Sequence, residues 1–217
     1  MISKYIKNKD LLLLAFTHRS WLNENEKATK SNERLEFLGD AVLEFVVSSF
    51  LYEKYPDKEE GFLTALRARL VNTASLAQVG KDLDLGDNLR LSKGEEETGG
   101  RTNDSLLANT VEAIIGAIYI ENGVKAAEKF INLYILKYVS EFESKPLKDF
   151  KSRLQEAVQA KGMSAPKYVV VSEKGLDHDK TFSVQVVIDG NGYEVGVGKS
   201  KSLAAQAAAE NTFNKFQ

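Results

Sequence analysis

The stretch Glu33-Arg34-Leu35-Glu36-Phe37-Leu38-Gly39-Asp40 places three carboxylates within eight residues of a segment that is otherwise largely apolar. Four acidic side chains follow i, i+3, i+7, i+11 spacing and so share one face of a predicted helix: Glu33, Glu36, Asp40 and Glu44. Like charges four residues apart cost about 0.2–0.5 kcal/mol per pair in an exposed helix. A hard cation such as Mg²⁺ prefers carboxylate oxygens and removes this cost. The stripe therefore predicts a metal site, with Glu44 at its end expected to be merely solvated.

A second polar pair, Asn109 and Glu112, stands at i, i+3 in a segment of small and apolar residues. A lone glutamate is expensive to bury without a partner. One interpretation pairs Glu112 with Arg67 or Arg69 inside the core. The other brings Glu112 to the acidic stripe as a further metal ligand, and the presence of that stripe favours this second interpretation.

Composition excludes several kinds of site. The chain has 217 residues, enough for one or two domains, and its 43% hydrophobic and 28% charged residues are typical of a globular protein. It has no cysteine, which excludes disulfides, zinc–cysteine sites and thiol nucleophiles. Its two histidines, His18 and His178, are far apart, so a histidine-rich metal site is not expected.

Charge and hydropathy indicate a cytoplasmic protein with no membrane partner. No apolar run approaches the roughly 20 residues that span a bilayer, and no signal peptide is recognised. The net charge of −2 argues against a uniformly basic nucleic-acid binder. Residues 148–217 nevertheless hold ten basic and eight acidic residues, whereas the preceding part is acidic on balance.

The first 143 residues are predicted to form an all-α domain. Apolar residues recur at helical spacing over residues 11–20, 32–55, 61–83, 105–122 and 124–142. Ser31 or Asn32 is the expected N-cap of the second helix, and Pro56 closes it. Residues 94–103 are glycine-rich and polar, which predicts an exposed and mobile loop.

Residues 144–148 are predicted to be a linker, and residues 149–217 a small α+β domain. The expected order is helix 149–161, strands 168–173, 181–188 and 193–199, and helix 202–216. Residues 189–192, Asp-Gly-Asn-Gly, predict a hairpin turn. The pattern α-β-β-β-α within about 70 residues is typical of a compact two-layer module.

These residues resemble a known family. Residues 32–43, Asn-Glu-Arg-Leu-Glu-Phe-Leu-Gly-Asp-Ala-Val-Leu, closely resemble the signature of ribonuclease III. The resemblance continues through residues 60–63, 67–71, 94–95 with 99–100, and 105–119. Residues 149–216 resemble the double-stranded-RNA-binding domain of bacterial members. The resemblance implies a homodimeric, Mg²⁺-dependent endoribonuclease for double-stranded RNA. It implies products with 5′-phosphate and 3′-hydroxyl ends, and processing of ribosomal and messenger RNA precursors.

The resemblance also assigns site residues in the helical domain. Mg²⁺, for which Mn²⁺ is expected to substitute, would be held by four side chains: Glu36, Asp40, Asn109 and Glu112. Asp40 and Glu112 are implied to be the essential catalytic pair. Glu33 and Glu60 match auxiliary acidic positions of the RNA-binding valley. Phe37 matches an aromatic residue that inserts into the partner subunit, with ordinary core packing as the alternative.

In the C-terminal domain the resemblance implies contacts to RNA along one side of the duplex. Gln155 and Glu156 match positions that face the minor groove, and His178 matches a loop that enters the next minor groove. Taken alone, His178 would be interpreted as a surface loop residue. Lys199 and Lys201 precede the predicted last helix, where cations suit phosphates. Ser202 stands where the family usually has a second lysine.

Asn109 is a departure from the family pattern, because many members carry aspartate there. An asparagine offers one neutral carbonyl oxygen, so weaker metal binding is expected. The alternative function is therefore a catalytically impaired double-stranded-RNA-binding protein, whether the replacement is natural or introduced. A structural ribosome-associated protein and a hydrolase of small phosphorylated molecules are less favoured, because the other acidic positions and the C-terminal domain remain intact.

Overall fold

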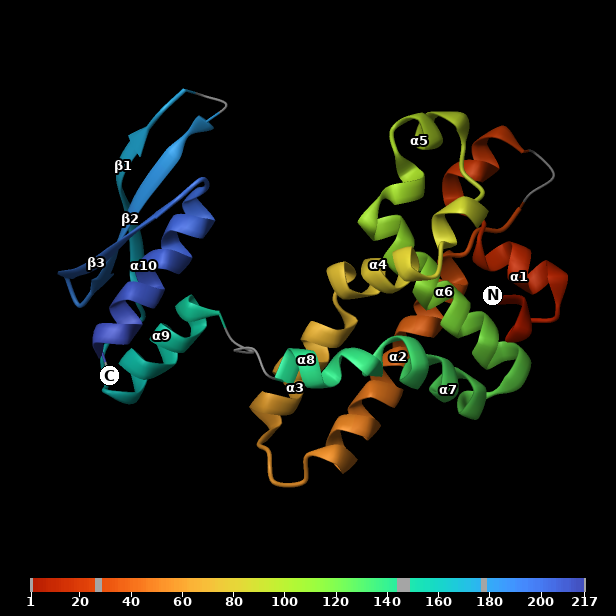
Figure 1. The fold of residues 1–217 in the computed structure, drawn as a ribbon, viewed down its shortest axis with the longest axis horizontal. Helices are drawn as coiled ribbons and strands as arrows, with labels where there is room; N and C mark the ends of the chain where they lie inside the picture. Colours follow the sequence, from red (N-terminus) through yellow and green to blue (C-terminus); the bar gives the residue numbers. More distant parts are fainter. Residues whose placement is uncertain (1, 26–28, 144–148, 177–178, 217) are drawn as a thin grey trace. The chain divides into compact units, whose positions relative to one another are not determined.

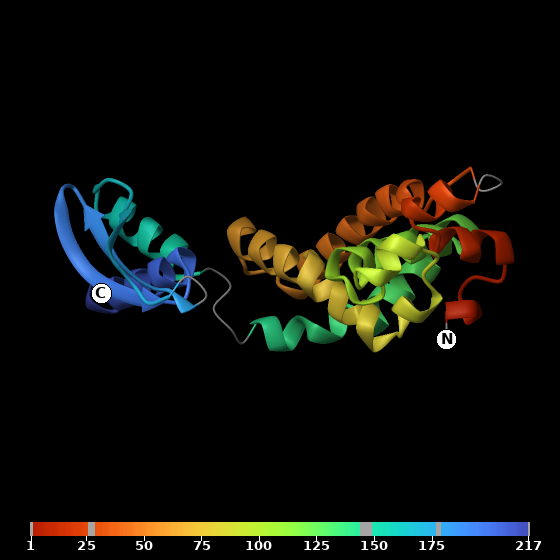
Figure 2. The same ribbon diagram turned by 90° about the horizontal axis from the view of Figure 1, so that it is seen from above.

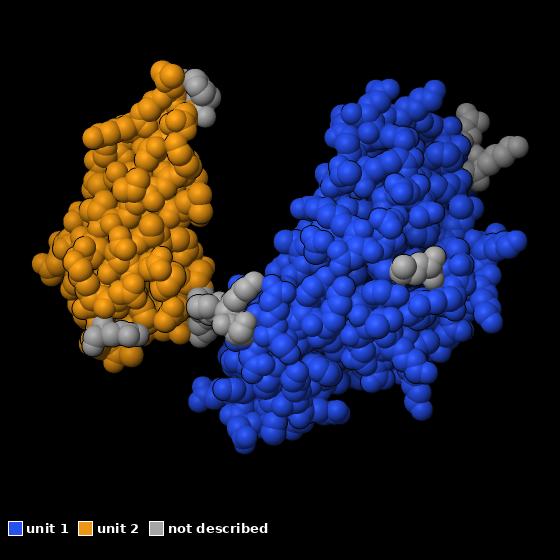
Figure 3. All heavy atoms as spheres, viewed as in Figure 1, with its two compact units in different colours: residues 1–147 blue, residues 148–217 orange. Residues whose placement is uncertain are grey.

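The computed structural model describes residues 2–25, 29–143, 149–176 and 179–216. The chain divides into two compact units, Met1–Leu147 and Lys148–Gln217 (Figure 3). The first unit is helical and the second combines helices with a three-stranded sheet (Figure 1), which confirms the predicted fold class. The predicted linker, residues 144–148, lies outside the described residues. No helix in the described ranges is long and apolar enough to cross a membrane.

The first unit is built from α-helices of very different length, with short 3-10 helices between some of them. In chain order the elements are η1 (Ile2–Lys4), α1 (Lys9–Ala15), η2 (Arg19–Glu24), α2 (Glu33–Lys54), α3 (Glu60–Val71), α4 (Thr73–Asp82), η3 (Leu85–Asn88), α5 (Lys93–Glu97), η4 (Gly100–Thr102), α6 (Asp104–Asn122), α7 (Val124–Tyr134), η5 (Leu136–Tyr138) and α8 (Val139–Glu143).

Helix α6 lies at the centre of this unit. Ten of its residues are buried, including Val111, Ile114 and Ile118, and it packs against α1, α2, α4 and α7 (Figure 1). A helix that is apolar on nearly every side must be enclosed by its neighbours. Glu112, a half-buried carboxylate, is therefore unusual in the middle of this largely buried and apolar helix.

Two glycines bring the backbones of α2 and α6 into contact. A Cβ atom built on Gly39 would overlap the carbonyl oxygen of Glu112, and one built on Gly116 would overlap the carbonyl oxygen of Leu35. Only hydrogen fits at either position. This close approach sets the spacing between the two helices that carry the candidate site.

Several helix boundaries differ from the predictions. The run predicted over residues 61–83 is two helices, because Asn72 is extended (φ −69°, ψ 161°) and its side chain accepts a hydrogen bond from the Ser75 amide at 2.9 Å. The run over residues 124–142 is interrupted by η5. Asn32 occupies the N-cap position of α2, but its Nδ2 donates to the carbonyl of Ala15 instead of its side chain capping the helix.

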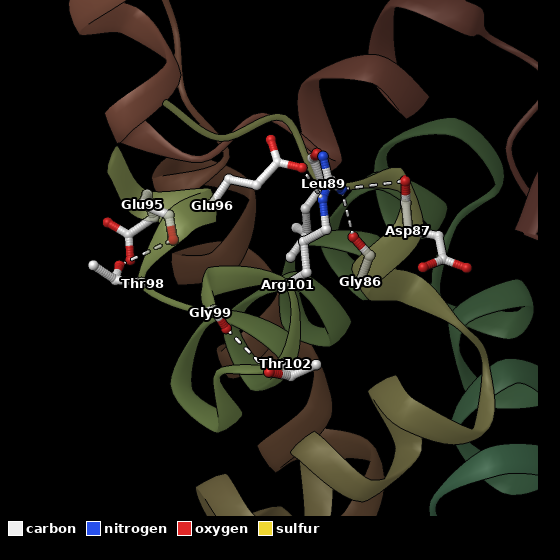
Figure 4. A network of polar contacts seen from close by, with 9 residues as sticks. All are labelled: Gly86, Asp87, Leu89, Glu95, Glu96, Thr98, Gly99, Arg101 and Thr102. Carbon is white, nitrogen blue, oxygen red and sulfur yellow. Dashed lines mark hydrogen bonds and ion pairs between the residues drawn. The ribbon is translucent and has the colours of Figure 1, made fainter. Parts of the chain in front are cut away.

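The glycine-rich segment 94–103, predicted to be a mobile loop, contains helical structure, since α5 ends in it and η4 follows. Arg101 organises this region (Figure 4). Its Nη1 donates to the carbonyl oxygens of Gly86, Leu89 and Asp87 at 2.9, 3.1 and 3.3 Å, and its Nε contacts Glu96 Oε1 at 2.7 Å. The guanidinium thus ties the segment that precedes α6 to η3.

The second unit contains α9 (Phe150–Ala160), β1 (Lys167–Lys174), β2 (Thr181–Ile188), β3 (Asn191–Gly198) and α10 (Lys201–Phe216). The strands are antiparallel in the order β1-β2-β3, and α10 packs on the sheet with α9 beside it (Figure 2). The predicted turn is present, with positive φ angles at Asp189 (50°) and Gly190 (81°). The alanines of α10 let it approach β3 so closely that a Cβ on Gly196 would overlap the Ala208 amide.

Candidate active site

The polar residues predicted to bind metal lie on the two helices that Gly39 and Gly116 hold together. Glu36 and Asp40 are on α2, and Asn109 and Glu112 are on α6. The site is defined here as the α2–α6 cluster of Glu36, Asp40, Asn109 and Glu112. Glu36, Asn109 and Glu112 are half-buried, whereas Asp40 is exposed. The cluster thus combines enclosed ligands with one open side.

The charge of Asp40 affects the pKa of both Glu36 and Glu112, so the three carboxylates lie close together. Burial, and then the charges of Asp40 and Glu36, raise the pKa of Glu112 from its usual 4.5 to about 7. Burial, and then Glu33 and Asp40, raise the pKa of Glu36 as well. Among the described residues, none of these three carboxylates accepts a hydrogen bond or forms an ion pair. No described side chain therefore compensates the negative charge of the cluster.

The donor set suits a hard cation, although the side chains do not converge on one point. Within the described ranges, no three acidic or histidine side chains form a group ready to hold a metal ion. Repulsion between like charges favours separated side chains when no cation is between them. Carboxylates and an amide oxygen on two adjoining helices are the ligand types that Mg²⁺ takes, usually together with water. The residues present fit such an ion.

Arg67, one of the two alternative partners of Glu112, is engaged elsewhere. Arg67 Nε lies 2.9 Å from Glu44 Oε2, and Arg67 Nη1 donates to Ser48 Oγ at 2.9 Å. The interpretation of Glu112 as an ion-pair partner of Arg67 is therefore wrong. The expectation that Glu44 is merely solvated is also wrong, because a cation from α3 meets it across the helix interface.

The two auxiliary acidic residues lie at helix starts. Glu33 begins α2, where it lies 3.4 Å from Arg19 and accepts a hydrogen bond from Ser31 Oγ at 2.7 Å. Glu60 begins α3 and accepts a hydrogen bond from Thr64 Oγ1 at 2.7 Å. It lines a groove of about 310 Å³ between α2 and α3, together with Arg67. Of the two, Glu33 is coupled electrostatically to the cluster through Glu36.

His18 lies near enough to Glu33, at the start of the acidic stripe, for that charge to affect its pKa. Burial lowers its pKa, while Glu95 and Glu33 oppose that effect. Its Nδ1 lies 2.9 Å from Ser20 Oγ, which in turn accepts a hydrogen bond from the Ser92 amide at 3.0 Å. His18 therefore links the start of η2, through Ser20, to the segment before α5, and its pKa is affected by the charge of Glu33. Its isolation from other histidines in the sequence gave no signal of this position.

Phe37 does not pack in the core. Its side chain is 80% exposed, and Phe45 and Tyr52 on the same helix are 62% and 74% exposed. The spacings of eight and seven residues place all three on one face of α2. We call Phe37, Phe45 and Tyr52 the α2 aromatic face. Core packing, the alternative interpretation of Phe37, is wrong for this chain.

The predicted RNA-binding residues of the second unit lie on its surface. Gln155 and Glu156 are exposed on α9, Lys199 follows β3, and Lys201 begins α10. Each lysine is paired with an acidic side chain, Lys199 with Asp179 and Lys201 with Glu173. His178 lies outside the described residues.

Each of the two units matches a known protein family. Residues 8–139 match the family model described as ribonuclease-III-like, and residues 150–216 match the double-stranded RNA binding motif. The chain is 43% identical to ribonuclease 3 of Bacillus velezensis over all of its 217 residues, covering 87% of that protein. It is 46% identical to ribonuclease 3 of Natranaerobius thermophilus, covering 98% of this chain and 92% of that one.

A solved structure supports the same assignment for the helical unit. The nuclease domain of ribonuclease III from Campylobacter jejuni is 42% identical, with a TM-score of 0.58, over 63% of this chain and 94% of that one. A helical nuclease unit joined to a double-stranded RNA binding motif defines an endonuclease that acts on double-stranded RNA. The chain belongs to the ribonuclease III family of endoribonucleases.

The raised pKa of Glu112 predicts a pH-dependent stability. Because this pKa is about 7 in the folded protein and 4.5 ordinarily, the unfolded chain releases the proton first as the pH rises. The metal-free protein should therefore lose stability between about pH 4.5 and pH 7. Urea unfolding at several pH values in that window measures this loss. A Glu112→Gln variant should show a smaller loss, and an equal loss in both proteins would contradict the assignment.

Proposed function

We propose that this chain is a Mg²⁺-dependent endonuclease whose metal ions are held by the α2–α6 cluster. The observation that carries this proposal is the environment of Glu112, a half-buried carboxylate beside Asp40 and Glu36 with no cationic partner among the described residues. Burying a charge in that way is costly unless something compensates it. A divalent cation would compensate it, and Mn²⁺ is expected to substitute for Mg²⁺.

The chemistry that the bound metal supplies is activation of water and stabilisation of charge at the scissile phosphate and the leaving oxygen. The chain's own residues provide the negative charge that holds it. Glu112, anchored on the buried helix α6, and Asp40, on the open side, are the proposed catalytic pair, with Glu36 and Asn109 completing the ligand set. Water attacks phosphorus and the bond to the 3′ oxygen breaks, which leaves 5′-phosphate and 3′-hydroxyl ends.

The α2 aromatic face supports the proposal that two copies assemble. Three aromatic side chains exposed on one face form the kind of surface that protein–protein interfaces cover. The Campylobacter jejuni structure is described as concerning a region involved in dimer formation of the nuclease domain. We assign residues 1–143 to catalysis and homodimerisation, with Phe37 entering the partner subunit. Glu33 and Glu60 would then border the valley that receives RNA.

The second unit, for which we take residues 149–217 after a linker at 144–148, would bind the duplex. Gln155, Glu156 and His178 are proposed to face the minor groove, and Lys199 and Lys201 the phosphates. A domain that reads duplex shape fits structured substrates such as ribosomal and messenger RNA precursors. We therefore propose that the protein acts in the cytoplasm.

Asn109 supports a second candidate, a protein that binds double-stranded RNA but cuts it poorly. Its carboxamide carries no charge, so the cluster holds one negative charge fewer than it would with aspartate. The three remaining carboxylates favour the active enzyme over this candidate.

The Asn109→Asp variant separates these two functions. Added negative charge should lower the Mg²⁺ concentration for half-maximal cleavage by about tenfold or more, since one unit of charge interaction in a half-buried site exceeds about 1.4 kcal/mol. Titrating Mg²⁺ in a duplex-cleavage assay measures the shift. If only Asn109→Asp cuts RNA, the wild-type chain is the impaired binder. If both cut RNA at the same Mg²⁺ concentration, Asn109 is not a ligand.

A further inference from the structure

The two lysines proposed to bind phosphates are each held by an acidic side chain of the same unit. Lys199 Nζ lies 2.6 Å from Asp179 Oδ1, and Lys201 Nζ lies 2.9 Å from Glu173 Oε1. The paired side chains stay open to solvent, at 64% and 67% exposure in the first pair and 62% and 42% in the second. Both lysines therefore already have an acidic partner when no RNA is bound.

The sheet register sets the Glu173–Lys201 pair. Glu173 on β1 lies opposite Phe182 on β2, and Phe182 lies opposite Gly198 on β3. The end of β3 is thus level with the end of β1, and Lys201 follows shortly after. Its Nζ also lies 5.5 Å from the centre of the Phe182 ring. Lys201 is held between a carboxylate of one outer strand and an aromatic ring of the middle strand.

A different element sets the Asp179–Lys199 pair. Asp179 ends the connection between β1 and β2, where its amide donates to the carbonyl of Leu176 at 2.8 Å. Gly175 adopts a positive φ of 105°, and a Cβ there would press on the Asp179 carbonyl oxygen. Asp179 itself is therefore constrained by its contacts to Leu176 and Gly175. The two acidic partners thus come from different parts of the fold. Strand β1 carries Glu173, which pairs with Lys201, and the β1–β2 connection carries Asp179, which pairs with Lys199.

We infer that Asp179 and Glu173 compete with RNA phosphates for Lys199 and Lys201, and so set the affinity and the salt dependence of RNA binding. This inference rests on the proposed RNA contacts of the two lysines. A phosphate that takes a lysine must displace the carboxylate, which then needs a counterion from solution. That uptake offsets part of the counterion release that drives binding to nucleic acid. The two acids thereby weaken binding and flatten its response to salt.

The test is equilibrium binding of the full chain to a blunt RNA duplex longer than about 16 base pairs, the span of one such domain. Divalent metal is omitted so that no cutting occurs. Asp179→Asn and Glu173→Gln should each bind about two- to fivefold more tightly at low salt. The slope of log Kd against log salt concentration should steepen by up to about one unit per released lysine.

Glu194→Gln is the matched control. Glu194 forms an ion pair of the same kind with Lys215, at 2.9 Å, and its loss removes the same charge from the same unit. Lys215 lies in the last turn of α10, about 20 Å along the helix from Lys201. This variant should bind RNA like the wild type.

Lys199→Gln and Lys201→Gln test the lysine–RNA contacts separately from the competition by the two acidic side chains. If these variants weaken binding while Asp179→Asn and Glu173→Gln bind no more tightly than Glu194→Gln, the competition is overturned and the lysine contacts stand. If the lysine variants bind like the wild type, the proposed lysine contacts fail and the competition fails with them. Circular dichroism of each variant confirms that the second unit remains folded.

Discussion

Replacing Glu112 with glutamine is expected to abolish cleavage of double-stranded RNA while leaving the metal-free fold at least as stable as the wild type near pH 7. Glutamine keeps the shape but removes the charge that a divalent cation needs. Losing a charged metal ligand should cost several kcal/mol of transition-state stabilisation, or at least about a thousandfold in rate. The same change removes a carboxylate whose pKa of about 7 shows that its ionised form is disfavoured.

This opposite response of activity and stability is what distinguishes a metal ligand from a structural residue. Single-turnover cleavage and urea unfolding of the same preparations measure both quantities. Glu128→Gln, which removes an exposed carboxylate of α7, serves as the control and should change neither. Loss of stability in step with loss of activity in Glu112→Gln would instead indicate that Glu112 supports the fold.

Replacing Gly39 with alanine is expected to destabilise the helical unit by about 3 kcal/mol and to reduce cleavage with it. The added methyl group would overlap the carbonyl of Glu112, and backbone atoms cannot move aside without separating α2 from α6. Overpacking of this kind is among the costly single substitutions. Because the chain has one tryptophan, Trp21 in η2, its fluorescence during denaturation reports on this unit.

Gly61→Ala provides the matched control for this effect. Gly61 lies in α3 with open space around the position of a Cβ, so alanine there should leave stability unchanged or raise it by up to about 1 kcal/mol. Equal denaturation midpoints for Gly39→Ala and Gly61→Ala would contradict the close contact between α2 and α6. The site would then not depend on these two glycines.

The fold class and the placement of Glu36 and Asp40 on one helix could be predicted from the sequence, because both depend on local periodicity. Four acidic side chains at i, i+3, i+7 and i+11 must share a face of any helix that contains them, and Glu36 and Asp40 lie on α2 as expected. The α-β-β-β-α order and the turn at Asp189 and Gly190 follow from alternation and turn residues alone.

The predictions that were wrong mostly concern contacts between residues that are far apart in the sequence. Nothing near Glu44 in the sequence shows that Arg67, on another helix, meets it. Arg101 orders a glycine-rich segment through the carbonyl oxygens of η3, which periodicity does not reveal. The break at Asn72 is different, because the asparagine that caps α4 is a local signal inside a long apolar run.

The α2–α6 cluster is proposed to make this chain an endonuclease. The most direct test is to compare the wild type with Asp40→Ala in the cleavage of a long, end-labelled RNA duplex in Mg²⁺. We predict fragments with 5′-phosphate and 3′-hydroxyl ends from the wild type, and no cleavage by Asp40→Ala despite unchanged duplex binding. Cleavage by Asp40→Ala at the wild-type rate would contradict the assigned site. Binding without cleavage by the wild type, in Mg²⁺ and in Mn²⁺, would contradict the enzyme itself.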